Sequence, residues 1–192
     1  MSMTPDAALA LLETHGRGGA WVCHCRAVAD HAAALGRALA RRHPVDHAFL
    51  WRAALLHDIG RSVTHDPVGH GVAGHRLLSE LGHDREAALC ASHVLFGLEA
   101  HEAAQFGLPE CPHQPEGLEE RIVTLVDFLV EHTRPTTLHL RFESLKQRNA
   151  DNPFFSGRLD RAHDRARVFM HWVEGEIGEP VEGLLAGQTG GG

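Results

Sequence analysis

The sequence contains no tyrosine and a single lysine, Lys146, although 17 of its 192 residues are histidines. Arginine, alanine, glycine and histidine are plentiful instead. We interpret this as a general compositional bias, so a histidine that stands alone is expected to be a surface or packing residue. A functional histidine has to be identified by its position relative to other chemically active residues.

Long apolar runs are missing too. No stretch approaches the roughly 18 to 20 apolar residues that cross a bilayer, and Pro5 and Asp6 stand where a signal peptide would need a basic and then an apolar segment. The net charge is −7 with neutral histidines, so no basic surface is predicted for nucleic-acid polymers or membranes. We therefore expect a soluble, cytoplasmic protein, and we leave open whether it forms a homodimer.

The four cysteines do not form paired C-x-x-C motifs. Cys23, Cys25, Cys90 and Cys111 are scattered along a chain without an export signal. This usage favours reduced thiols over disulfides or a zinc knuckle.

Segments that alternate polar and apolar residues with period two are also absent, so strands are not expected. Helical spacing predicts an all-α domain of about seven to nine helices. We expect one domain over residues 1–186, with a core at about 20–133, C-terminal helices at about 138–178, and a disordered tail over 187–192. The predicted helices span residues 5–16, 21–42, 46–60, 70–81, 85–95, 99–106, 117–132, 138–148 and 158–177.

The central motif lies at the end of the strongly apolar segment 46–60, where His57 and Asp58 are followed by Gly60. Consecutive helical residues point about 100° apart, so this pair cannot share one packing role. Both side chains can still reach a metal held where their helix meets its neighbours. Neutral imidazole and carboxylate are good ligands for first-row divalent metals.

Further histidines and an aspartate follow this pair in a recognisable order. His24 lies in the first turns of the helix predicted for 21–42, His70 and His93 come after the pair, and Asp127 follows Leu125 and Val126. The order His, His-Asp, His, His, Asp resembles the HD superfamily of metal-dependent phosphohydrolases, from about residue 23 to residue 131. The flanking segments 61–65 and 97–103 are similar to those of a little-characterised prokaryotic group of stand-alone HD proteins.

The resemblance implies that His24, His57, Asp58 and Asp127 hold one divalent metal ion. His70 and His93 would supply the ligands of a second ion, with Asp58 as the bridge. Oxygen and nitrogen ligands suit iron, manganese, cobalt, nickel or zinc, and both the metal and the number of ions, one or two, stay open.

Arg61 and His65 follow the ligand pair closely. With the resemblance to the HD superfamily, we predict that they hold the phosphate of the substrate, since a guanidinium binds two phosphate oxygens at once. The alternative for both is an ordinary solvated loop. Asp58, Arg61 and His65 are therefore the predicted catalytic residues.

These residues predict a metal-dependent phosphohydrolase or phosphodiesterase that acts on a nucleotide or another small phosphorylated metabolite through a metal-activated water. The negative net charge is compatible with such a substrate, because a bound metal reverses the local sign. One alternative is an HD-type di-iron oxygenase acting on a phosphonate or polyol, which would use the same six ligands. A second alternative is a non-catalytic ligand-binding module, although a complete set of six polar residues argues against it.

Overall fold

The computed structural model describes residues 3–188 and is built almost entirely from helices. Its two strands, β1 (Val130–Glu131) and β2 (Arg134–Pro135), form one short antiparallel hairpin. The predicted all-α class is therefore confirmed. The α-helices of the described part are α1 (Pro5–Gly16), α2 (Ala20–Leu39), α3 (His47–Leu56), α4 (Gly69–Glu80), α5 (Asp84–Ser92), α6 (Ala100–Gln105), α7 (Leu118–Leu129), α8 (Leu138–Arg148), α9 (Pro153–Ser156), α10 (Leu159–Ile177) and α11 (Val181–Gly187), with short 3-10 helices η1 (Ile59–Ser62) and η2 (Val94–Phe96).

Several helices begin at side chains that cap them. Thr4 accepts a hydrogen bond from the backbone nitrogen of Ala7 at 3.2 Å and opens α1, and Asp46 accepts one from Phe49 at 2.9 Å and opens α3. Thr137 caps α8 in the same way. Such caps satisfy backbone donors that have no partner inside the helix, and each contributes about 1 kcal/mol.

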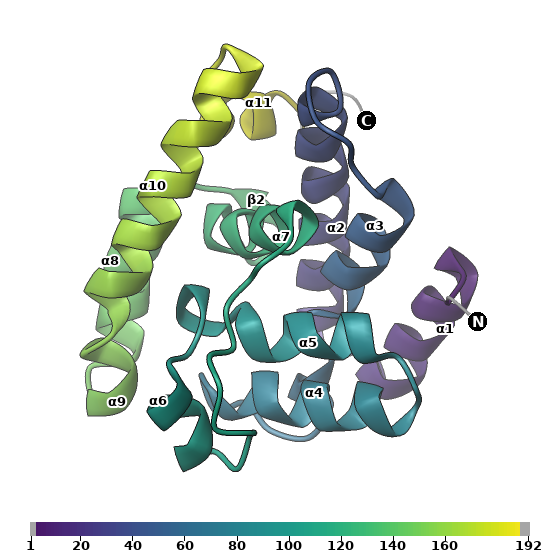
Figure 1. Ribbon diagram of the computed structural model, residues 1–192, viewed down its shortest axis with the longest axis vertical. Helices are drawn as coiled ribbons and strands as arrows, with labels where there is room; N and C mark the ends of the chain where they lie inside the picture. The colour runs from purple at the N-terminus through teal and green to yellow at the C-terminus, as the bar shows by residue number, and fades with distance from the viewer. Residues whose placement is uncertain (1–2, 189–192) are drawn as a thin grey trace.

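The helices surround α7 and α3. Figure 1 shows α2 and α3 on one side of α7, α10 on the other, and α4 and α5 packed together at one end. Every residue of α3 from Ala53 to Leu56 is buried, and α7 contributes a further apolar face that includes Ile122 and Val126. A helix that is apolar on most sides has to lie inside the fold, and this places the end of α3 at its centre.

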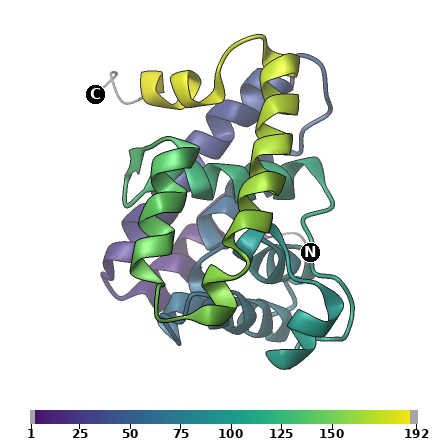
Figure 2. The ribbon, with the colours of Figure 1, turned by 90° about the vertical axis from the view of Figure 1, so that its left-hand side faces the viewer.

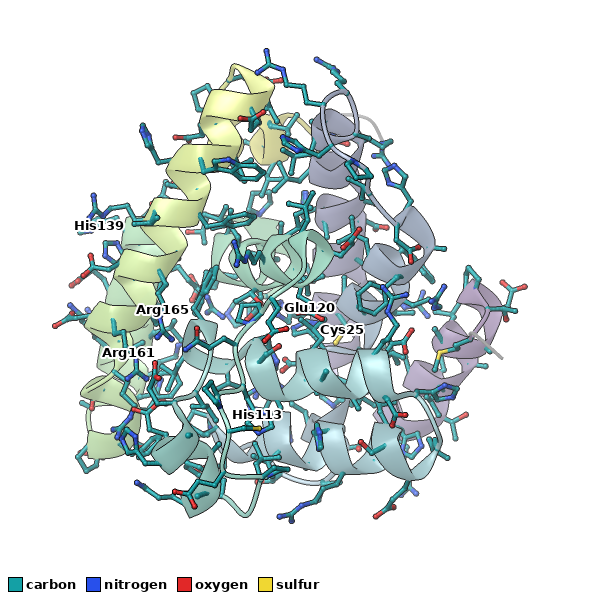
Figure 3. The ribbon with its side chains drawn as sticks, in the orientation of Figure 1. Cys25, His113, Glu120, His139, Arg161 and Arg165 are labelled. Atoms are coloured by element: carbon teal, nitrogen blue, oxygen red, sulfur yellow. The ribbon has the colours of Figure 1, made fainter. Side chains whose placement is uncertain are left out.

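The C-terminal helices cover the outer side of α7. In Figure 2, α8 and α10 lie side by side against it. Ion pairs attach α10 to the segment around α6: Arg158 and Arg161 both contact Glu102 at 2.6 Å, and Arg165 pairs with Glu99. Figure 3 shows Arg161 and Arg165 extending from α10.

Three glycines allow η1, α4 and α5 to approach closely. A Cβ atom added to Gly60 would lie 1.9 Å from the carbonyl oxygen of His70, and one on Gly71 would lie 2.5 Å from that of Cys90. At Gly74 the nearest atom, the sulfur of Cys90, would be at 3.1 Å. The glycine that follows the His57-Asp58 pair is therefore needed for backbone contact with the helix that carries His70.

The structure corrects some of the predicted element boundaries. The helix expected over 46–60 ends at Leu56, because Asp58 (φ −103°, ψ 12°) leaves the helical conformation and starts η1. The helix expected over 117–132 ends at Leu129 and continues into the β hairpin, whose two-residue strands are too short to show a period-two pattern. Gly187, which we expected in a disordered tail, ends α11; residues 189–192 of that tail lie outside the described residues.

Candidate metal centre

The end of α3 places His57 and Asp58 in the interior of the molecule. Leu56 is the last residue of the helix, and the chain then turns through Asp58 into η1. His57 is 0% exposed and Asp58 is 2% exposed. Two side chains of this polarity need specific partners at such a depth.

Four other helices bring those partners. His24 comes from the second turn of α2, His70 from the first turn of α4, His93 from the residue that ends α5, and Asp127 from the last turn of α7. The structure therefore brings together all six residues predicted as metal ligands, although they span more than 100 positions of the chain.

The contacts within this group, which we call the His/Asp cluster, are short. His24 Nε2 lies 2.9 Å from Asp127 Oδ1, and His57 Nε2 lies 3.6 Å from the same oxygen. His70 Nε2 is 2.9 Å from Asp58 Oδ1, and His93 Nε2 is 3.7 Å from it. The ring nitrogens and carboxylate oxygens of the cluster thus face a common centre.

Each of the four histidines is oriented in the same way. Its Nδ1 donates to a backbone carbonyl, and its Nε2 is directed into the cluster. The acceptors are the carbonyls of His132 for His24 (2.9 Å), Ala54 for His57 (2.7 Å), Asp66 for His70 (2.8 Å) and Cys90 for His93 (2.9 Å). When such a ring is neutral, its lone pair lies on Nε2, as in metal-binding histidines.

Some polar atoms of the cluster make no well-oriented hydrogen bond with the described residues. His57 Nε2 and Asp58 Oδ1 are buried and take part in no well-oriented hydrogen bond. In addition, the Nε2 atoms of His70 and His93 lie 3.2 Å apart, although both rings already donate through Nδ1. Two lone pairs that face each other at this distance repel unless a proton or a cation lies between them. The donor set therefore fits a metal ion.

Two groups of three residues could each hold an ion, with their ligand atoms within 4.8 Å of one another. They are His24, His57 and Asp127, and His57, Asp58 and His93. The two oxygens of Asp58 also point to different sides: Oδ1 faces His70 and His93, whereas Oδ2 faces His57 and Arg61.

The electrostatics of the cluster favour ionised carboxylates. Burial raises the pKa of Asp58, but His70, His57 and Arg61 outweigh it and hold that pKa well below its usual range. Burial opposes ionisation of Asp127 in the same way, but the hydrogen bond from His24 and the proximity of His57 hold its pKa low as well. For His70, burial lowers the pKa more than Asp58 raises it, which favours the neutral imidazole. For His24, burial also lowers the pKa, but the hydrogen bond and charge of Asp127 outweigh it and raise the pKa. Ionised carboxylates and neutral imidazoles are the forms that bind metals.

The two predicted phosphate-binding residues lie at the entrance. Arg61 donates through Nε to Asp58 Oδ2, and His65 is exposed in the loop that follows. Both line a cavity of about 210 Å³ that reaches His70, His93 and Asp127, and both line a second cavity of about 800 Å³ that reaches His24 and Asp58. The cluster is therefore open to a ligand on two sides, and both openings pass Arg61 and His65.

Strained backbone lies beside the cluster. Leu95 (φ 56°) and Phe96 (φ 55°), two and three residues after His93, adopt the left-handed conformation that side chains with a Cβ rarely take. Leu95 lines the smaller cavity. Such strain is concentrated at functional sites, where the surrounding fold stabilises it.

Other residues at the site carried no signal in the sequence. Arg141 and Arg148 of α8 line both cavities, and the carbonyl of His132, at φ 56° in the hairpin turn, orients His24. A backbone carbonyl has no residue signature, and arginines are frequent in this chain. Only the fold of α8 and the hairpin places them at the cluster.

Comparison with known proteins agrees with this geometry. A model of the HD domain matches residues 21–130. An uncharacterised protein of Methanocaldococcus jannaschii is 42% identical over 113 residues, which cover 58% of this chain and 66% of that protein. No solved structure matches the chain significantly.

Two further relatives are named tRNA (cytidine(56)-2'-O)-methyltransferases. The protein of Picrophilus torridus is 31% identical over 122 residues, covering 63% of this chain and 35% of its own length. That of Thermoplasma volcanium is 32% identical over 132 residues, covering 67% and 38%. The chain thus spans just under two thirds of the Methanocaldococcus protein and little more than a third of the two methyltransferases. Because the HD-domain model matches more than half of the chain, and the histidines and aspartates of its motif converge in the structure, this chain belongs to the HD-domain family.

Proposed function

We propose that the protein is a metal-dependent phosphohydrolase or phosphodiesterase acting on a nucleotide or another small phosphorylated metabolite. The main support is the orientation of the four histidines, each held by a backbone carbonyl so that Nε2 faces Asp58 or Asp127. Packing alone would not require four imidazoles and two carboxylates to direct their ligand atoms at one buried centre.

In this proposal His24, His57, Asp58 and Asp127 hold one ion, and His70 and His93 complete a second site with Asp58 between them. The two oxygens of Asp58 face opposite sides of the cluster, which suits a shared ligand. A bound divalent metal would supply positive charge for the phosphoryl oxygens and would lower the pKa of a water molecule.

Arg61 and His65 would position the phosphate. The Nε of Arg61 is held by Asp58, so its two terminal nitrogens can turn toward a ligand in the cavities that Arg61 lines. A fixed guanidinium binds phosphate with less loss of side-chain entropy than a free one. His65 lies at the exposed end of the same loop and adds a second donor.

We do not propose methyl transfer for this chain, although two of its relatives are named tRNA methyltransferases. The chain matches little more than a third of each. The side chains of the His/Asp cluster are metal ligands, and methyl transfer does not require such a set. We therefore propose hydrolysis as the activity of the chain itself.

The test is metal analysis of the anaerobically purified protein combined with a panel of phosphorylated substrates. We expect about one or two divalent ions per chain and phosphate release that Asp58→Ala reduces by at least about 100-fold, because the shared carboxylate is lost. Iron with oxygen uptake and no phosphate release would instead indicate the di-iron oxygenase. A protein that contained no metal and showed no turnover would contradict both proposed enzyme activities, and the non-catalytic ligand-binding module would be the remaining alternative.

A further inference from the structure

Two arginines outside the segment matched by the HD-domain model face the cluster. Arg141 and Arg148 belong to α8, which begins at Leu138, after the matched residues 21–130. Both line the cavity that reaches His70, His93 and Asp127, and both also line the one that reaches His24 and Asp58. With Arg61 they form a positively charged wall around the openings of the site.

This wall has more positive than negative charge. Arg148 lies 3.0 Å from Glu131 Oε1 and Arg141 lies 3.5 Å from the same oxygen, which also accepts a hydrogen bond from Ser144 at 2.7 Å. One carboxylate thus serves two guanidinium groups. The pair therefore keeps about one positive charge for another anion.

Arg141 also has unused hydrogen-bonding capacity. Arg141 is 12% exposed at its side chain, and its Nε is buried without a hydrogen-bond partner among the described residues. Burial lowers the pKa of Arg148, and the nearby charge of Arg141 lowers it further; Glu131 raises it only in part, and Arg61 adds a smaller lowering. Bringing like charges together is costly in the absence of a ligand, and an anion bound between them would relieve that cost.

We infer that Arg141 and Arg148 bind a second phosphate group of the substrate, so that the substrate is a small molecule with two separate phosphates. This inference rests on the proposed function for the first phosphate, which would lie at the His/Asp cluster beside Arg61. Arg141 and Arg148 are held by a different carboxylate, that of Glu131 on β1, whereas Arg61 is held by Asp58. Leu145 and Phe155 line the same cavity and offer an apolar wall to the organic part between the two phosphates.

The experiment counts inorganic phosphate bound to the 192-residue chain by equilibrium dialysis with labelled phosphate. The wild type should bind about two phosphates. Chelation of the metal should abolish the binding of one, and the double variant Arg141→Met/Arg148→Met should abolish the binding of the other. Each single arginine variant should lower the affinity for the second phosphate by about 10- to 100-fold, as expected for losing charge-assisted hydrogen bonds. Lys146→Met is the matched control, since Lys146 lies on α8 but pairs with Asp160 at 3.2 Å.

Two further variants separate a binding role from a structural one. Arg141→Lys keeps the charge but loses the planar fork, so binding should be intermediate. Glu131→Gln removes the competing carboxylate and should tighten the second phosphate several-fold, whereas a purely structural role would make both Glu131 and arginine variants weaken it. Circular dichroism of each variant verifies folding.

The outcomes distinguish the two proposals. If the wild type bound only the phosphate that depends on Arg141 and Arg148, and no phosphate that chelation removes, the proposed metal centre would be contradicted and the arginine site would stand. A wild type without any phosphate that depends on Arg141 and Arg148, or with equal loss in Lys146→Met, would overturn the inference.

Discussion

At the scale of single residues, the roles of the histidines follow from which of their nitrogens is already bound. His57, His70 and His93 donate through Nδ1 to carbonyls within four residues of themselves. His24 instead donates to His132, 108 positions away, so its orientation depends on the β hairpin. The local contacts are properties of a helix end, whereas the long-range one requires the complete fold.

His70 and His93 give the clearest residue-level prediction. They are the candidates for the second ion, so His70→Ala and His93→Ala should each reduce the metal content from about two ions to about one, as expected when a two-metal site loses a ligand. Metal analysis of the purified variants measures the number of ions per chain. The control is His139→Ala, since His139 is exposed and points outward in Figure 3.

Unchanged metal content and turnover in both variants would mean a single ion at most. His70 and His93 would then be buried histidines that line the cavity. The di-iron oxygenase would be excluded by the same result, because it needs the second site.

At the scale of elements, close approach of η1 to α4 sets the position of His70. Gly60→Ala should therefore destabilise the protein by about 1 to 3 kcal/mol, a typical cost of overpacking. It should also lower metal content, because the new Cβ would meet the carbonyl of His70 itself. Chemical denaturation and metal analysis measure the two effects.

Gly175→Ala is the control for this change. Gly175 lies in α10 with nothing within 4 Å of an added Cβ, so alanine should be neutral or stabilise the helix by up to about 1 kcal/mol. If Gly60→Ala behaved like Gly175→Ala, the close contact between η1 and α4 would not be needed.

The attachment of α10 to α6 should depend on pH through Glu102. Burial raises the pKa of this carboxyl, but hydrogen bonds from Arg161, the backbone of Glu99 and Arg158 lower it from 4.5 to about 2. Because the folded pKa is below the unfolded one, the stabilisation is present above pH 4.5 and is lost as the pH falls toward 2. A shift of this size corresponds to at most about 3 kcal/mol.

Denaturation of the wild type and Glu102→Gln at several pH values checks this. The stability difference between them should be largest near neutral pH and should shrink as the pH falls below about 4.5, where the wild-type carboxylate takes up its proton. Glu13→Gln, at an exposed pair with Arg26, should change stability by less than about 1 kcal/mol. A Glu102 difference that is independent of pH would mean that shape, not charge, holds α10 in place.

At the scale of the whole molecule, the sequence predicted the helical class, most of the helices, and the six residues of the cluster. The six residues could be identified because His57 and Asp58 end an unusually apolar helix and because the other histidines and Asp127 follow in a recognisable order. Their role as metal ligands stays a prediction. The chain turn at Asp58, the β hairpin, α9 and α11 were missed. Each depends on contacts between distant segments of the chain. The helical pattern in the sequence continues through residues 57–60 and 130–132, so it does not reveal these contacts.

The surface around the cluster was also beyond the sequence. Arg141 and Arg148 lie more than 80 positions from Asp58 and reach the site only because α8 packs against α7. None of the helices in residues 3–188 combines the length and apolar character needed to cross a membrane. The predicted division into one domain with a C-terminal tail stays a prediction.

The most direct test of the account is a crystal structure of the anaerobically purified protein, with anomalous diffraction measured at the absorption edge of its metal. We predict a peak within about 2.0 to 2.3 Å of His24, His57, Asp58 and Asp127, the usual distance for these ligands, and a second peak beside His70 and His93. A metal-loaded protein whose peaks lie elsewhere, or whose six side chains face apart, would contradict the account.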